Sequence, residues 1–152
     1  MPSTSSIAAS SGGDVADGRV GVVIVTHGSL ARELTAAARR IIDGLEDVVP
    51  ISIGWEQDVD EARERIKAGL EKVTGTAGAL ILTDMFGGTP TNLALTFLDE
   101  GHIEVVTGVN LPMLLKLTTL ADDRPLRDVA ADLKEQAQKS IHVASEVLAS
   151  ET

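Results

Sequence analysis

A histidine and an aspartate each follow directly after a short apolar run of the chain. His27 follows the run 20–26, and Asp84 follows the run 79–83. A neutral imidazole is a good nucleophile near neutral pH once a partner on its other ring nitrogen fixes the tautomer. A carboxylate can be that partner, and it also stabilises the cation that forms when the free nitrogen attacks phosphorus. Together the two side chains predict a site that handles a phosphoryl group on histidine.

Glycines accompany both of these residues. Gly28 follows the histidine directly and would let a substrate approach the backbone closely. The turn Gly87-Gly88-Thr89 follows the second apolar run, with Thr89 as the expected cap of a helix and Pro90 as its first residue. Such a turn can direct backbone N–H groups at an anion, although it matches neither a P-loop nor a dinucleotide fingerprint. We therefore expect these three glycines and Thr89 to bind phosphate.

Each of these residues also has a purely structural interpretation. His27 could close a strand with a hydrogen bond to a carbonyl, and Asp84 could cap the loop that follows it. The glycines could form only a tight turn and a helix cap. The position of the histidine and the aspartate at the ends of two apolar runs favours the functional interpretation.

Other residue types limit the chemistry further. The remaining histidines, His102 and His142, lack metal-ligand spacing with His27, and the chain has no cysteine. We therefore predict no metal site and no organic cofactor. Large apolar residues stand in loops near the predicted site, namely Trp55, Met85 and Phe86. Docking of a partner and simple packing explain them equally well.

The site requires strands that alternate with helices. Apolar runs and turn signals predict strands over 20–26, 48–53, 78–83 and 102–107, and helices over about 30–43, 59–73, 90–100, 113–120 and 125–139. Alternation of this kind implies an α/β fold with a doubly wound, mainly parallel sheet and helices on both faces. In a flavodoxin-like strand order of 2-1-3-4 the first and third strands are neighbours. His27 and Asp84 would then share the rim where ligands bind in such sheets.

Local signals refine these elements. Ser29 and Asp58 are expected N-caps, and Glu61 completes a pattern similar to a capping box. Pro50 moves the second strand toward an edge of the sheet. Residues 140–149 fit either a helix or one face of a strand, so an extra C-terminal antiparallel strand stays an alternative.

Length and composition suggest one domain and exclude several functions. The chain has 152 residues, and residues 1–18 are small, polar and aperiodic. We expect a disordered tail over 1–18 and a single domain over 19–152. A net charge of −10 and 2% aromatic residues argue against nucleic acid and anionic membranes as partners. No apolar run is long enough for membrane insertion, and the absence of cysteine fits a cytoplasmic location.

Three motifs carry a resemblance to a known family. They are V-T-H-G-S-L at 25–30, T-D-M-F-G-G-T-P-T-N at 83–92 and G-V-N-L-P-M at 108–113. In this order they resemble the mannose-family enzyme IIA of the bacterial phosphotransferase system, over about residues 19–149. Thr89 stands where many relatives carry serine, which keeps a hydroxyl group at this position.

The resemblance implies a function and partners. His27 would accept a phosphoryl group from the phosphocarrier protein HPr and pass it to an enzyme IIB during sugar uptake and phosphorylation. Asp84 would orient the histidine. The family also implies a homodimer whose C-terminal strand is exchanged between subunits. Two other hypotheses stay open at this point: a regulatory phosphocarrier without a transport role, and a phosphohydrolase that uses His27 and Asp84 on a small substrate.

Overall fold

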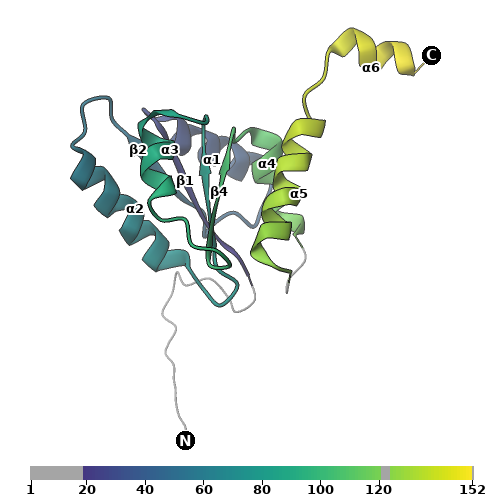
Figure 1. The fold of residues 1–152 in the computed structure, drawn as a ribbon. Helices are drawn as coiled ribbons and strands as arrows, with labels where there is room; N and C mark the ends of the chain where they lie inside the picture. The colour runs from purple at the N-terminus through teal and green to yellow at the C-terminus, as the bar shows by residue number, and fades with distance from the viewer. Residues whose placement is uncertain (1–18, 121–123, 152) are drawn as a thin grey trace, which may run out of the picture.

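A parallel sheet forms the centre of the protein. The computed structural model describes residues 19–120 and 124–151. Its strands are β1 (Gly21–His27), β2 (Val49–Ile53), β3 (Ala79–Thr83) and β4 (Ile103–Thr107). Their order is β2-β1-β3-β4, and all neighbouring pairs are parallel (Figure 1). This order confirms the α/β fold and the 2-1-3-4 arrangement expected from the sequence.

Helices cover both faces of the sheet. They are α1 (Leu30–Ile41), α2 (Val59–Val73), α3 (Gly88–Leu95), α4 (Leu111–Lys116), α5 (Leu126–Lys139) and α6 (Ala144–Ser150), with the 3-10 turn η2 (Leu117–Thr119) after α4. Successive strand residues point to opposite faces. Val22 and Ile24 therefore pack in one core with α1, α4 and α5, whereas Val23 and Val25 pack in a second core with α2 and α3. This double coverage explains why the β1 sequence is apolar throughout.

The helix caps agree with the sequence in one case and differ in another. The Asp58 carboxylate accepts a 3.0 Å hydrogen bond from the Glu61 backbone N–H, as the capping pattern predicted. Ser29 occupies the N-cap position of α1, but its side chain makes no capping hydrogen bond. The Thr26 hydroxyl takes over this role, because it accepts a 2.6 Å hydrogen bond from the Ala31 backbone N–H.

The start of α3 corrects the sequence prediction. The helix begins at Gly88 with Gly87 at the N-cap, so Thr89 is its second residue and not its cap. Both glycines have positive φ, 89° at Gly87 and 83° at Gly88, which a residue with a side chain rarely adopts. The glycines therefore make the turn themselves, and a threonine cap is not needed.

Three helix boundaries were also predicted wrongly. α1 ends at Ile41, ahead of the expected residue 43. α3 ends at Leu95 and not near residue 100, because the chain turns early into β4, where Asp99 and Ile103 exchange backbone hydrogen bonds. α4 starts at Leu111, ahead of the expected residue 113, because the Asn110 side chain accepts a hydrogen bond from a backbone N–H of the first turn.

The C-terminal segment forms a helix in this structure. The residues of α6 are all exposed, and the helix extends away from the body of the domain beyond α5 (Figure 1). The alternative of an antiparallel C-terminal strand is therefore not what the single chain adopts. The expected disordered tail, 1–18, lies outside the described residues. Within residues 19–120 and 124–151, no helix combines the length and the apolar character needed to cross a membrane.

We predict that the substitution Gly21→Ala destabilises the folded protein. A Cβ atom at Gly21 would lie 2.2 Å from the Val73 backbone oxygen, so β1 or α2 would have to move. The free energy of unfolding should fall by about 3 kcal/mol or more, as in strong overpacking. Urea denaturation followed by circular dichroism measures the change.

Gly54→Ala is the matched control for this prediction. A Cβ at Gly54 would have its nearest neighbour at 3.8 Å, which is an ordinary contact. We expect its effect to stay within about 0.5 kcal/mol. Equal stabilities of the two variants would contradict the packing of α2 against β1.

Candidate functional site

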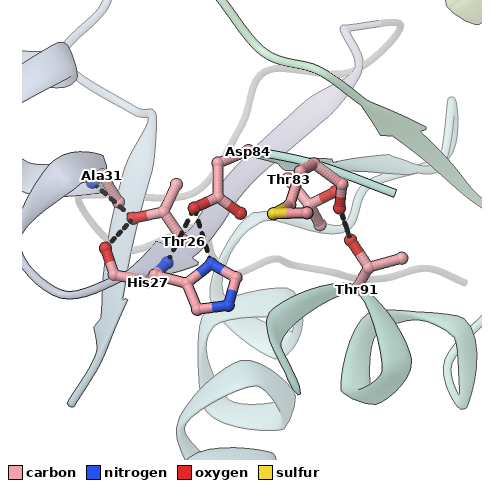
Figure 2. A network of polar contacts seen from close by, with 7 residues as sticks. Thr26, His27, Ala31, Thr83, Asp84 and Thr91 are labelled. Carbon is pink, nitrogen blue, oxygen red and sulfur yellow. Dashed lines mark hydrogen bonds and ion pairs between the residues drawn. The ribbon is translucent and has the colours of Figure 1, made fainter. Parts of the chain in front are cut away.

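His27 and Asp84 lie in direct contact at the carboxyl ends of two neighbouring strands. His27 is the last residue of β1, and Asp84 follows β3 directly. One carboxylate oxygen, Oδ2, accepts a 3.0 Å hydrogen bond from the His27 backbone N–H and lies 2.9 Å from the ring nitrogen Nδ1 (Figure 2). The side chains are 24% and 12% exposed, so solvent screens the pair only in part.

This contact decides which nitrogen of the ring is free to react. A carboxylate accepts hydrogen bonds, so Nδ1 carries the proton and the Nε2 lone pair of the neutral ring is available. The other carboxylate oxygen, Oδ1, is buried and has no hydrogen-bond partner among the described residues. The negative charge of Asp84 is therefore directed mainly at His27. Such a pair can make a nucleophile and stabilise the charge that the ring gains on attack.

Buried threonines hold the strand ends in place. The Thr91 hydroxyl of α3 lies 2.7 Å from the Thr83 hydroxyl of β3 and also contacts the Met85 backbone oxygen (Figure 2). These contacts tie the loop after Asp84 to the start of α3. Thr26 fixes the start of α1 in the same way on the other side of the site. None of these three roles was predicted from the sequence, although a threonine stands next to each of the two candidate residues.

The glycines differ in their distance from the ring. A Cβ atom at Gly88 would lie 2.9 Å from Cε1 and 3.0 Å from Nε2 of His27, so the backbone there passes close to the free nitrogen. A Cβ at Gly87 would meet nothing within 4 Å. Thr89 is exposed on the first turn of α3. Phosphate binding by Gly28, Gly87, Gly88 and Thr89 stays a prediction, and Gly88 has the geometry that suits it best.

Three exposed large apolar side chains lie on the loops that follow β2 and β3 next to the site. The Trp55 ring stacks on the His27 ring, with centroids 5.4 Å apart and an angle of 26° between the planes. The loop after Asp84 adds two further exposed side chains, Met85 and Phe86. The sequence predicted that these three residues lie near the site, but it did not predict that Trp55 stacks on His27.

The other histidines are not part of the site. His102 precedes β4 and lies 3.8 Å from Asp99 in an exposed pair. His142 lies in the segment between α5 and α6. Within the parts of the chain that the structure describes, no group of three His, Asp or Glu side chains is placed to hold a metal ion.

Comparison with known proteins identifies the family. The family model described as "PTS system fructose IIA component", of the EIIA-man type, matches residues 21–134, a range that includes His27 and Asp84. The chain belongs to this family of phosphotransferase-system enzyme IIA components.

Individual relatives agree with this assignment. The chain is 36% identical over 110 residues to the mannose-specific EIIAB component of Escherichia coli (strain K12), a match covering 72% of this chain and 34% of that protein. It therefore spans about a third of the length of that relative. It is 29% identical over 130 residues to the fructose-specific EIIA component of Bacillus subtilis (strain 168), which covers 85% of this chain and 89% of that protein.

Solved structures of the family share the fold. The mannose/sorbose-specific IIA subunit from Enterococcus faecalis superposes with a TM-score of 0.74 at 25% identity, and the match covers 82% of this chain and 94% of that subunit. The parallel sheet that brings β1 and β3 together is thus the architecture of enzyme IIA components of this type.

We predict the tautomer of His27 from its contact with Asp84. The neutral ring should carry its proton on Nδ1 and leave Nε2 unprotonated, because Oδ2 lies 2.9 Å from Nδ1. Long-range nitrogen–proton NMR spectra at alkaline pH distinguish the two forms. Free histidine in solution, which favours the Nε2-protonated tautomer, is the comparison. Observation of the Nε2-protonated form at His27 would contradict this geometry.

Proposed function

We propose that the protein is a phosphocarrier of the phosphotransferase system and is phosphorylated reversibly on Nε2 of His27. Phosphorylated HPr is the donor, and an enzyme IIB is the acceptor, in sugar uptake and phosphorylation in the cytoplasm. The observation that carries the proposal is the contact between Nδ1 of His27 and Asp84 at 2.9 Å, which leaves Nε2 as the nucleophile. The relatives described above are phosphotransferase components, which supports a carrier over a hydrolase.

The residues of the site account for both half-reactions. Nε2 of His27 attacks the phosphorus of phosphorylated HPr, the bond from the donor nitrogen to phosphorus breaks, and its electron pair returns to that nitrogen. The proton on Nδ1 stays hydrogen-bonded to Asp84, so the ring becomes positively charged while the Nε2–P bond forms. In transfer to enzyme IIB a nucleophilic atom of that protein forms a bond to phosphorus, the Nε2–P bond breaks, and its electron pair returns to Nε2.

The turn at the start of α3 supports a role in binding the phosphoryl group. Gly88 lies against the ring edge that carries Nε2, and it is the first residue of a helix. Backbone N–H groups at a helix N-terminus stabilise negative charge on phosphoryl oxygens. A Cβ atom at Gly88 would crowd Cε1 and Nε2 of His27, so glycine keeps this edge of the ring free of a side chain.

The exposed apolar side chains near His27 suit the docking of carrier proteins. Trp55, Met85 and Phe86 are exposed by 80%, 54% and 77% around a reactive nitrogen that a protein donor must reach. Exposed apolar side chains that cluster in this way mark protein interaction sites. The same surface has to serve HPr and enzyme IIB in turn, because both transfers use the same nitrogen.

Two substitutions should separate the nucleophile from the residue that orients it. His27→Ala should give no phosphoprotein with phosphoenolpyruvate, enzyme I and HPr at any time. Asp84→Asn should be phosphorylated about 10²–10⁴-fold more slowly, because an amide hydrogen-bonds to the ring but does not stabilise its charge. Mass spectrometry over a time course measures both. Full phosphorylation of His27→Ala, or phosphate on His102 or His142, would refute the assignment of the acceptor.

We also propose that the protein is a homodimer that uses its C-terminal segment. The apolar residues Ile141, Val143 and Leu148 are exposed by 74%, 58% and 65%, and α6 contains no buried residue. An apolar segment of this kind gains stability when a second copy covers it. The enzyme IIA resemblance gives the same expectation.

Substitution within this segment tests the assembly. The full chain should have about twice the monomer mass of 15.9 kDa in light scattering, and Ile141→Asp should weaken the dimer. Ser145→Asp is the control, because it adds the same charge to the C-terminal segment without removing an apolar side chain. A full-length protein that stays monomeric at high concentration would contradict the dimer.

A further inference from the structure

The position of Trp55 is not explained by packing in a core. Its side chain is 80% exposed, yet its ring lies over the imidazole of His27 at 5.4 Å between centroids. We propose that Trp55 is a positioning residue that holds the His27 ring and stabilises the positive charge which the ring gains with the phosphoryl group. This inference rests on the proposed function, in which His27 is the phosphoryl acceptor.

Three groups confine the imidazole from different directions. Asp84 contacts Nδ1, the Gly88 backbone lies against the edge formed by Cε1 and Nε2, and the Trp55 indole covers one face. A single hydrogen bond at Nδ1 would allow the ring to tilt about that contact. The indole opposes this tilt, so Nε2 keeps its direction toward an incoming phosphorus atom.

Trp55 also covers the glycine that follows the histidine. A Cβ atom at Gly28 would lie 3.6 Å from the indole nitrogen Nε1 of Trp55, within van der Waals distance. Gly28 itself is tied to β2, because its backbone N–H donates a 2.8 Å hydrogen bond to the Ile53 backbone oxygen. The indole therefore spans the His27-Gly28 segment as a whole.

The loop that carries Trp55 is braced on both sides. The Gln57 side-chain oxygen accepts hydrogen bonds from the Gly54 backbone N–H at 3.2 Å and from Arg65 at 3.1 Å. The same Arg65 nitrogen lies 2.8 Å from the Ser52 backbone oxygen, to which it also donates. These contacts tie the loop to α2 and to β2. The hydrogen bonds fix the position of this loop, and Trp55 is therefore kept beside His27 although its side chain is exposed.

The positive charge that the ring gains on phosphorylation makes this contact stronger. The face of an indole attracts a cation, whereas a neutral imidazole interacts with it only through weaker stacking. The ring of phosphorylated His27 has a proton on Nδ1 and phosphorus on Nε2, and it therefore has the charge of an imidazolium. At an exposed site this attraction corresponds to about a 2- to 5-fold shift of the phosphoryl-transfer equilibrium toward the carrier. A tryptophan with a merely structural role would not shift that equilibrium.

Ring-proton NMR tests the stacking without any phosphoryl donor. In Trp55→Ala the His27 ring protons should shift markedly at fixed alkaline pH, because the ring current of the indole is lost. Trp55→Phe should keep part of the effect. Leu98→Ala is the control, since Leu98 is an exposed apolar residue beyond the far end of α3 from Gly88. Unchanged His27 ring-proton shifts in Trp55→Ala would overturn the proposal.

The equilibrium between phosphorylated HPr and the full-length protein tests the effect on charge. We expect the equilibrium constant to fall about 2- to 5-fold in Trp55→Ala, to recover in Trp55→Phe and to stay unchanged in Leu98→Ala. An equilibrium constant does not depend on how tightly HPr docks, so this measurement separates charge stabilisation from a docking role. An unchanged constant in Trp55→Ala, with normal phosphorylation of the wild type, would overturn the role of Trp55 alone. A wild type that HPr does not phosphorylate would overturn the proposed function as well.

Discussion

The hydrogen bond between Asp84 and Nδ1 of His27 is the interaction on which the rest of the site depends. It decides the tautomer of the ring, directs Nε2 toward Gly88 and places a negative charge beside a ring that becomes positive on attack. The two residues are 57 positions apart in the chain and meet only because β1 and β3 are neighbours. The parallel sheet is therefore the scaffold that makes the site.

Other residues around the site hold His27 and Asp84 in position without contacting Nδ1 themselves. The threonines at the strand ends anchor the loops from within the protein, and glycine at position 88 lets the backbone pass close to the ring edge that carries Nε2. Trp55 closes one face of the ring from outside. The arrangement leaves one nitrogen accessible and fixes its direction, as a carrier requires if it is to receive a phosphoryl group from one protein and pass it to another.

Much of this arrangement could be predicted from the sequence because it follows from strong patterns. Apolar runs that end at His27 and Asp84 predict strands, and alternation with helices predicts the sheet order that brings these residues together. The Asp58 cap and the edge position of β2 at Pro50 follow from local chemistry. Periodicity and caps are properties of short segments, so a single sequence carries them directly.

The features that the sequence did not predict depend on the path of the folded chain, both between distant segments and within short turns. The stacking of Trp55 on His27 joins the loop after β2 to the end of β1, and only the folded sheet defines their relative position. The Thr26 hydroxyl caps α1 in place of Ser29, which requires the particular path of the chain after β1. After the early end of α3, Asp99 and Ile103 exchange backbone hydrogen bonds as the chain turns into β4. The segment 140–149 stayed ambiguous because its apolar residues suit two structures, and burial does not decide between them in the single chain.

The most direct test of this account is phosphorus–nitrogen NMR of the phosphorylated full-length protein. The account predicts phosphorus coupled to Nε2 of His27 while Nδ1 of the same ring keeps its proton and its hydrogen bond to Asp84. Phosphorus on Nδ1 of His27, or on any other side chain, would contradict it, because the Asp84 contact would then not decide which atom reacts.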